Sequence, residues 1–205
     1  MNIPWLDCDT PLPTPESAQK KGSPLAGLVA AGGGLSVTRL CEAYQQGMFP
    51  WFSEGQPVLW WSPDPRMVLP TQNFKLHRSL RKTLHHFIES PNCEIRMDTA
   101  FPDVIRCCAQ APRHGQAGTW IVEEMIEAYI ALHNAGLAHS VETWIDHQLV
   151  GGCIAYRSAI HCLASLCLRT RQTPRKLPWL RSSPLLVRIS WIGSTVNKIP
   201  SIWRH

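Results

Sequence analysis

Apolar side chains recur at three- and four-residue spacing in four stretches of the chain, and this period is typical of helices with one buried face. The first stretch predicts a helix from Ser36, a good capping residue, through Gln46, with Gly47 at its end. The others predict helices over residues 75–87, 98–110 and 123–134. Outside the second helix, the positions expected to face inward are Val37, Leu40, Cys41, Tyr44, Phe101, Val104, Ile105, Cys108, Met125, Ile126, Tyr129 and Ile130.

Two shorter stretches alternate between apolar and polar positions, as strands with one buried face do. They are residues 139–143 and 148–152, and Asp146-His147 between them predicts a hairpin. Residues 1–26, rich in Pro, Ser and Lys, predict an irregular lead-in. Gly32–Gly34 predicts a plain turn, since no strand, Lys or Thr stands where a nucleotide-binding loop needs them. Helices followed by a hairpin indicate an α+β fold.

Residues 48–66 hold five aromatic side chains and four prolines. Prolines stiffen the backbone and aromatic rings supply flat surfaces, so the stretch is either a rigid pocket wall or an apolar joint between two lobes. Each ring on its own is as consistent with a place in the core as with a ligand site. Because three of the five are tryptophans (Trp51, Trp60 and Trp61), we expect at least one to stack on a planar ligand such as a nucleobase.

The predicted helix over residues 75–87 has two unlike faces. Its apolar face is formed by Leu76, Leu80, Leu84 and Phe87, and its polar face by Arg78, Arg81, Lys82 and His85. A basic face of this kind is commonly just solvated. Here no acidic residue compensates it, although residues 1–152 as a whole are net negative, and this favours a site for phosphate groups.

Charge is distributed unevenly along the 205 residues. The 20 Lys and Arg outnumber the 15 Asp and Glu, yet all 15 acids lie in residues 1–152, together with only 11 of the basic residues. Residues 153–205 carry the other nine basic side chains and no acid. Folded domains contain roughly one acid in eight to ten residues. The charge composition of the chain therefore changes near Gly152.

Several classes of protein are excluded by the sequence. No apolar run approaches the ~20 residues that cross a bilayer, and residues 1–7 lack the basic and apolar regions of a signal peptide. A cytoplasmic protein is therefore expected, with its eight cysteines as reduced thiols. The spacing of these cysteines matches no zinc motif, so we expect no metal site.

Five motifs then occur in a fixed order: FPWF (Phe49–Phe52), LWWSPDPR (Leu59–Arg66), GTWI (Gly118–Ile121), AHSVETW (Ala138–Trp144) and LVGG (Leu149–Gly152). In this order they closely resemble the leucyl/phenylalanyl-tRNA–protein transferase family. GLVAAGGGLS (Gly27–Ser36) and AYQQGMFPWF (Ala43–Phe52) resemble the family's entry segment, although Gly34 stands where the family usually has Asp. The resemblance covers residues 27–152.

The resemblance implies a small N-terminal domain and a GNAT-like acyltransferase domain. It also implies an aminoacyltransferase that moves Leu or Phe from an aminoacyl-tRNA to proteins with an N-terminal Arg or Lys. That reaction marks the acceptor for degradation in the bacterial cytosol and needs no cofactor, metal, membrane or DNA. By resemblance, Trp51 and Trp120 hold the 3′-terminal adenosine, and Arg78, Arg81 and Lys82 contact the tRNA backbone.

After Gly152 the resemblance stops. The family continues with a GESMF segment and with later segments that line the amino-acid pocket and carry the proposed catalytic carboxylate, so the catalytic residues are unknown here. Regrouped by one base, codons for Cys162–Leu168 can encode Phe-Gly-Glu-Ser-Met-Phe. We therefore expect an N-terminal domain over 1–66, the first half of a GNAT-like domain over 67–152, and a basic tail over 153–205 translated out of frame. The second domain would then be incomplete and the edges of its hairpin exposed.

Two other functions stay open. In the first, the aromatic and basic surfaces hold tRNA without chemistry. Separately, as the alternative to a change of frame, residues 153–205 could be a genuine basic segment that binds RNA. An acyltransferase with a different nucleotide-linked acyl donor would need a glycine-rich turn after the hairpin. Cys153–Ser165 offers no such turn.

Overall fold

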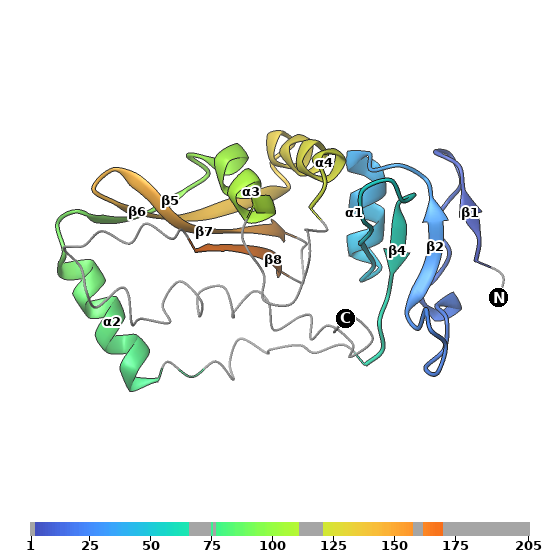
Figure 1. Cartoon of the computed structure of the whole chain (residues 1–205), viewed down its shortest axis with the longest axis horizontal. Coiled ribbons are helices and arrows are strands. Elements are labelled where there is room, and N and C mark those ends of the chain that lie inside the picture. The colour runs from blue at the N-terminus through green and yellow to red at the C-terminus, as the bar shows by residue number, and fades with distance from the viewer. Residues whose placement is uncertain (1–2, 66–74, 76, 111–120, 158–161, 170–205) are drawn as a thin grey trace. The chain divides into compact units, whose positions relative to one another are not determined.

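The computed structural model describes residues 3–65, 75, 77–110, 121–157 and 162–169. These residues form two compact units (Figure 1). Unit 1 contains the described residues of 1–66 and 113–135, and unit 2 contains those of 67–112 and 136–198. Both units combine helices with a β-sheet, which confirms the α+β class.

Unit 1 is built on a sheet with the strand order β1-β2-β4-β3. The strands are β1 (Trp5–Leu6), β2 (Leu28–Gly32), β3 (Phe49–Pro50) and β4 (Leu59–Trp61). β1 lies parallel to β2, and β4 lies antiparallel to both β2 and β3. A short 3-10 helix, η1 (Pro15–Ser17), lies between β1 and β2 in the chain.

The sheet of unit 1 corrects two predictions. β1 lies within the expected irregular lead-in, and β2 runs into the triple glycine and ends on Gly32, where the sequence predicts no strand. All five residues of β2 are buried. A short strand buried on both faces shows no alternation, so its period gives no signal in the sequence.

Two helices complete unit 1, and both confirm the predicted positions. α1 (Val37–Gln45) begins after Ser36, whose side-chain oxygen accepts a hydrogen bond from the Arg39 backbone N–H at 3.2 Å. α4 (Glu123–Asn134) ends before Gly136, which has a φ of +72°. The buried residues of α4 are Met125, Ile126, Ala128, Tyr129 and Leu132, whereas Ile130, which we expected to face inward, is half-buried.

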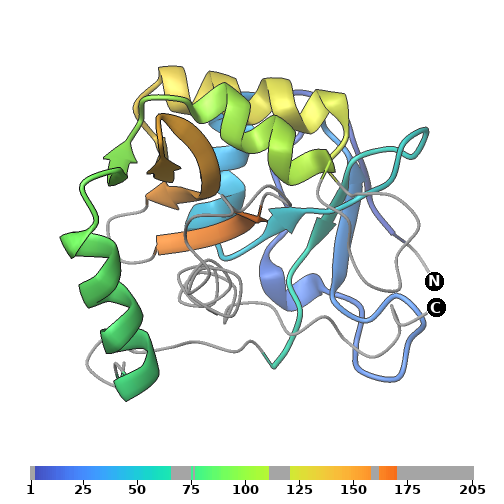
Figure 2. The same cartoon turned by 60° about the vertical axis from the view of Figure 1, so that its left-hand side comes forward.

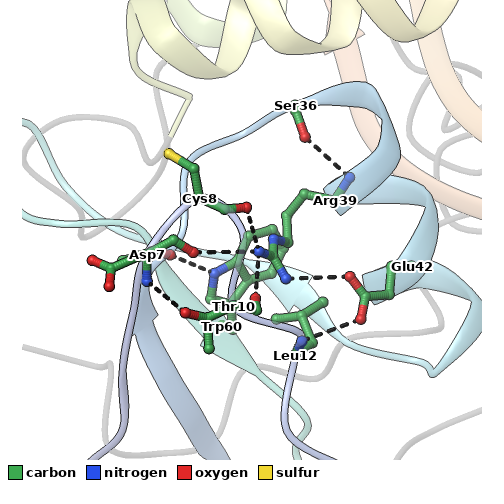
Figure 3. A network of polar contacts seen from close by, with 9 residues as sticks. Asp7, Cys8, Thr10, Leu12, Ser36, Arg39, Glu42 and Trp60 are labelled. Atoms are coloured by element: carbon green, nitrogen blue, oxygen red, sulfur yellow. Dashed lines mark hydrogen bonds and ion pairs between the residues drawn. The ribbon is translucent and has the colours of Figure 1, made fainter.

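A buried arginine fixes the chain after β1 to α1 (Figure 3). The Arg39 guanidinium donates hydrogen bonds to the backbone carbonyls of Cys8 at 2.9 Å and Thr10 at 2.5 Å, and to the Glu42 carboxylate at 3.2 Å. Glu42 in turn accepts a hydrogen bond from the Leu12 backbone N–H at 3.1 Å. Only 5% of Arg39 is exposed, so its charge is compensated inside the unit rather than by water.

Unit 2 contains an antiparallel sheet with the order β5-β6-β7-β8. Its strands are β5 (Cys93–Met97), β6 (Ala138–Ile145), β7 (Gln148–Arg157) and β8 (Cys162–Arg169). Asp146 and His147 join β6 to β7 with φ angles of +49° and +61°, as a two-residue hairpin turn requires. The predicted hairpin is therefore confirmed.

Both strands of this hairpin are longer than predicted, and their outer edges are paired. β5 pairs with the free side of β6, and β8 pairs with the free side of β7. The exposed hairpin edges that we expected are therefore not seen. β7 also continues through Arg157, five residues beyond Gly152.

Two helices accompany the sheet of unit 2. α3 (Phe101–Gln110) buries Phe101, Val104, Ile105 and Cys108, as predicted, although it begins three residues later than expected. It packs closely on β7, because a Cβ added to Gly152 would lie 3.0 Å from a Val104 methyl carbon. α2 (Arg78–Glu89) also begins three residues later than predicted, and residues 90–92 connect it to β5 (Figure 2).

No helix in the described ranges is long and apolar enough to cross a membrane. Within those same ranges, no group of three or more His, Cys, Asp or Glu side chains could hold a metal ion.

Candidate functional site

The predicted basic residues lie together on α2. Arg78, Arg81 and Lys82 are all exposed, and their three- and four-residue spacing places them along one side of the helix. We call these three residues the basic stripe. His85 continues the stripe, and its Nδ1 lies 3.0 Å from the Glu89 carboxylate. On the apolar side Phe87 is buried and Leu84 is half-buried.

The position of the basic stripe on the helix is electrostatically unusual. The first turn of α2 contains no acidic residue, and the side chain of His77, the residue before the helix, does not cap its backbone N–H groups. The N-terminus of a helix carries a partial positive charge, which favours anions and disfavours cations. Arginines placed there add to that field, so the charge at this end of α2 favours anionic over cationic groups.

Of the two predicted contacts to the 3′-terminal adenosine, Trp51 lies within the described residues. It follows β3 and is half-buried, and its backbone is held on both sides. Its N–H donates to the Leu59 carbonyl at 2.9 Å, and its own carbonyl accepts a hydrogen bond from the Trp61 indole N–H at 2.8 Å. The backbone that carries the Trp51 ring is therefore fixed within unit 1.

The other tryptophans of the aromatic stretch belong to the core. Trp60 is fully buried and donates its indole N–H to the Gly32 carbonyl at 2.8 Å, and Trp61 is 4% exposed. Of the three tryptophans in residues 48–66, Trp51 alone is half-buried rather than buried. Trp120, the second predicted adenosine contact, lies outside the described residues, and Ile121 beside it is buried.

A buried carboxylate that no sequence motif predicts to be functional lies in unit 2. Glu142 on β6 is 0% exposed, and both of its oxygens accept hydrogen bonds. Oε1 receives the Thr99 N–H at 3.0 Å, the Ala100 N–H at 2.8 Å and the Ser140 hydroxyl at 2.7 Å. Oε2 receives the Thr99 hydroxyl and, at 3.1 Å, the Trp144 indole N–H.

These donors determine the ionisation of Glu142. Burial alone would raise the pKa of its carboxyl, but the hydrogen bonds from Thr99, Ser140, Ala100 and Trp144 outweigh burial and lower that pKa. A carboxylate whose two oxygens accept five hydrogen bonds is poorly placed to take a proton from a substrate. Glu142 therefore positions the turn between β5 and α3 rather than acting as a base in this arrangement.

A second acidic residue holds the same turn. Asp98 has a φ of +56°, and its carboxylate lies 2.8 Å from His139 Nδ1 and accepts the Ser140 backbone N–H at 2.8 Å. The motif AHSVETW contains His139, Ser140, Glu142 and Trp144, so its polar residues serve the join between β6 and the start of α3. The signal for this cluster in the sequence was Glu142, an acidic residue within the predicted strand 139–143.

Comparison with known proteins identifies the family. A family model described as leucyl/phenylalanyl-tRNA protein transferase matches residues 68–167, and the model of its N-terminal domain matches residues 33–64. The chain belongs to the leucyl/phenylalanyl-tRNA–protein transferase family. Trp51 lies in the match to the N-terminal domain, and the basic stripe and Glu142 lie in the match to the main domain.

Curated members of the leucyl/phenylalanyl-tRNA–protein transferase family are similar over most of this chain. The relative from Polaromonas sp. is 59% identical over 150 residues, which are 73% of this chain and 59% of the relative. The relative from Leptothrix cholodnii is 58% identical over 153 residues, which are 73% of this chain and 60% of the relative. That from Albidiferax ferrireducens is 53% identical over 160 residues, or 77% of this chain and 63% of the relative. The chain thus spans about three-fifths of the length of these relatives.

The family match also extends the range found by sequence reasoning. The resemblance was expected to end at Gly152, whereas the match to the main domain runs fifteen residues further, to residue 167. These fifteen residues contain the end of β7 and most of β8.

Proposed function

We propose that this chain binds aminoacyl-tRNA and serves the transfer of Leu or Phe to proteins with an N-terminal Arg or Lys. The observation that carries the proposal is the basic stripe, which is exposed and begins in the N-terminal turn of α2, where no acidic residue lies. The relatives of this chain are named for this transfer. Arg78, Arg81 and Lys82 would contact the tRNA backbone. Trp51 and Trp120 would hold the 3′-terminal adenosine, and the half-buried Trp51 would do so by stacking on the base.

The proposed reaction is the aminolysis of an ester. The uncharged α-amino nitrogen of the acceptor attacks the aminoacyl carbonyl carbon, and a tetrahedral oxyanion forms. The bond to the tRNA 3′ oxygen then breaks, a peptide bond remains, and the proton lost by the amine ends on the leaving 3′ hydroxyl. Neither a cofactor nor a metal takes part, and the reaction takes place in the cytoplasm. The unit-2 sheet with α3 would form the first half of a GNAT-like domain.

We also propose that the reading frame changes after Gly152, so that this chain binds tRNA but transfers poorly. Residues 153–205 contain no Asp or Glu, and the regrouped codons of residues 162–168 can encode the family's GESMF segment. The family match to residue 167 counts against a break directly after Gly152, because residues read out of frame should not match the family. Resequencing the gene across codons 150 to 168 decides between the two readings. An unbroken frame without GESMF in the alternative reading would refute this part of the proposal.

The activity test compares this chain with the intact Polaromonas relative. Radiolabelled leucine on tRNA is offered with a peptide that begins with Arg, and binding of the same tRNA is measured in parallel at several salt concentrations. We expect salt-dependent binding by both proteins, efficient transfer by the relative, and little or no transfer by this chain. Transfer by this chain at a comparable rate would contradict the proposed impairment, and absence of tRNA binding would contradict the proposed function.

A further inference from the structure

β5 is the outer strand of the unit-2 sheet and pairs with β6 alone among the described strands. Proteins usually protect such an edge with proline, a bulge or charges, since its unpaired backbone groups recruit other strands. β5 contains no proline, and its register with β6 is unbroken from Cys93 to Met97. Its two charged residues, Glu94 and Arg96, form an ion pair with each other. Within the described part of unit 2, this edge is open for pairing.

The hydrogen bonds of β5 identify the backbone groups that face outward. Asn92 and Asp98, which flank the strand, bond toward β6: the Asn92 carbonyl accepts the Asp146 N–H at 3.0 Å, and the Asp98 N–H donates to the Ser140 carbonyl at 3.2 Å. In an antiparallel pair, alternate residues direct their N–H and C=O groups to the same side. Residues 93, 95 and 97 therefore direct theirs away from β6. The Cys93 N–H donates to the Ser90 carbonyl at 3.0 Å, so the pairing proposed here rests on the groups of Ile95.

The side chains of β5 are also exposed at this edge. Ile95 is 49% exposed and Met97 is 61% exposed, on the same face of the sheet. On the other face, Arg96 Nη2 lies 3.0 Å from the Glu94 carboxylate, and the Arg96 guanidinium lies 4.5 Å from the centre of the Trp144 ring. β5 thus presents apolar side chains on one face and one charge of each sign on the other.

From this arrangement we infer that β5 is a docking edge for the β5 strand of a second copy of this chain. In an antiparallel pairing about a two-fold axis at Ile95, the two Ile95 residues face each other and exchange backbone hydrogen bonds. Glu94 of each copy then lies opposite Arg96 of the other, and Cys93 lies opposite Met97. The two sheets join into one across the axis.

The charge pattern selects a second copy over other extended peptides. The sequence Glu94-Ile95-Arg96 is self-complementary in this antiparallel register, whereas a two-fold axis at residue 94 or 96 would place Glu94 opposite Glu94 or Arg96 opposite Arg96. Two opposite-charge pairs form in the proposed register. The proposal does not depend on the proposed function, because it uses no residue of the tRNA site.

Charge reversal tests the pairing in the full chain. Glu94→Arg gives each copy two positive charges at these positions, and Arg96→Glu gives each copy two negative charges. Each variant alone would place like charges opposite each other at both pairs, and we expect its self-association to weaken about tenfold. A mixture of the two variants, or the double variant that exchanges both charges, restores complementary pairs and should associate like the unchanged chain.

Sedimentation equilibrium, at concentrations reaching about 1 mM where weak associations become populated, measures these outcomes. Ile95→Pro serves as a further variant, because it removes an outward N–H while leaving the hydrogen bonds to β6 in place. Circular dichroism and thermal unfolding show that each variant is folded. A monomeric unchanged chain at every concentration would overturn the inference. So would single charge variants that associate as strongly alone as when mixed.

Discussion

The phenolic hydroxyls of Tyr44 and Tyr129 are hydrogen-bonded to each other inside unit 1. Tyr44 lies on α1 and Tyr129 on α4, and they are 6% and 3% exposed. Their rings meet edge to face, with centroids 6.5 Å apart. The contact joins two helices that are separated by some eighty residues of chain, so it helps to hold α4 in the unit that contains Trp51.

Replacing Tyr129 by Phe should destabilise unit 1 by about 1–2 kcal/mol, because a buried hydrogen bond is lost while the ring remains. Burial raises the pKa of Tyr129 from 10 to about 12. Between these values the unfolded chain loses the phenolic proton and the folded chain keeps it, so the stabilisation is complete below pH 10 and is lost as the pH rises through about 12. Urea unfolding at pH 8 and pH 11 measures both effects. The variant should lose less stability than the unchanged chain between these pH values, and an equal loss would contradict the prediction.

Replacing Glu142 by Gln should cost about 3 kcal/mol, because an amide offers one acceptor oxygen to donors that now share two. The pKa of Glu142 is lowered in the folded chain, so the stabilisation is present above the unfolded value near 4.5 and is lost as the pH falls through the lower folded value. Glu89→Gln, at an exposed position of the same unit, is the control and should change the free energy of unfolding very little. Urea unfolding at pH 7 and pH 4 compares the two variants. Equal effects would show that the donors around Glu142 contribute nothing.

Arg39→Lys should detach the chain between β1 and η1 from α1. One ammonium group cannot replace the planar guanidinium that reaches the carbonyls of Cys8 and Thr10 and the carboxylate of Glu42 (Figure 3). We expect a loss of about 2–3 kcal/mol and faster proteolysis within residues 7–12. Arg106→Lys on the exposed side of α3 is the control. An unchanged cleavage pattern for Arg39→Lys would show that the Arg39 guanidinium does not hold residues 7–12 against α1.

Changing Arg78, Arg81 and Lys82 together to Gln should weaken tRNA binding for all tRNA sequences alike. If each residue neutralises one phosphate, the slope of log affinity against log salt should fall by about 2 to 3. The matched control changes Lys20, Lys21 and Arg106, which are exposed and outside the stripe, to Gln and so removes the same charge. Filter binding over a range of salt concentrations decides between a local site and a general effect of net charge. Equal slopes for the two triple variants would exclude the basic stripe as the contact.

Trp51→Ala should weaken binding of aminoacyl-tRNA about tenfold or more, because stacking of one base on an aromatic ring contributes about 1–3 kcal/mol. Trp51→Phe should retain most of the affinity. Trp5→Ala, at a residue that is 66% exposed, is the control for loss of an accessible tryptophan. Binding of tRNA that lacks the terminal adenosine should be insensitive to Trp51→Ala. A loss of affinity for that shortened tRNA would place Trp51 elsewhere on the RNA.

Several features could be predicted from the sequence because they depend on neighbouring residues. The helical period and the cap at Ser36 determined α1, and the same period determined α3 and α4. The two-residue turn at Asp146-His147 determined the hairpin. The stripe on α2 was also predictable, since residues three and four apart share a helix face. The order of the motifs was sufficient to indicate the family, which the family models confirmed.

The tertiary structure decided which polar and aromatic groups are buried. Trp51, Trp60 and Trp61 are equivalent in the sequence, but the pairing of β4 with β2 and β3 buries two of them and leaves the first partly accessible. In the sequence, Glu142 and Arg39 cannot be distinguished from exposed charged residues. Their hydrogen-bond donors and acceptors lie up to 43 residues away in the chain and meet them only in the folded structure. A local pattern specifies a local conformation, whereas burial and the compensation of a buried charge depend on segments that meet only in the folded chain.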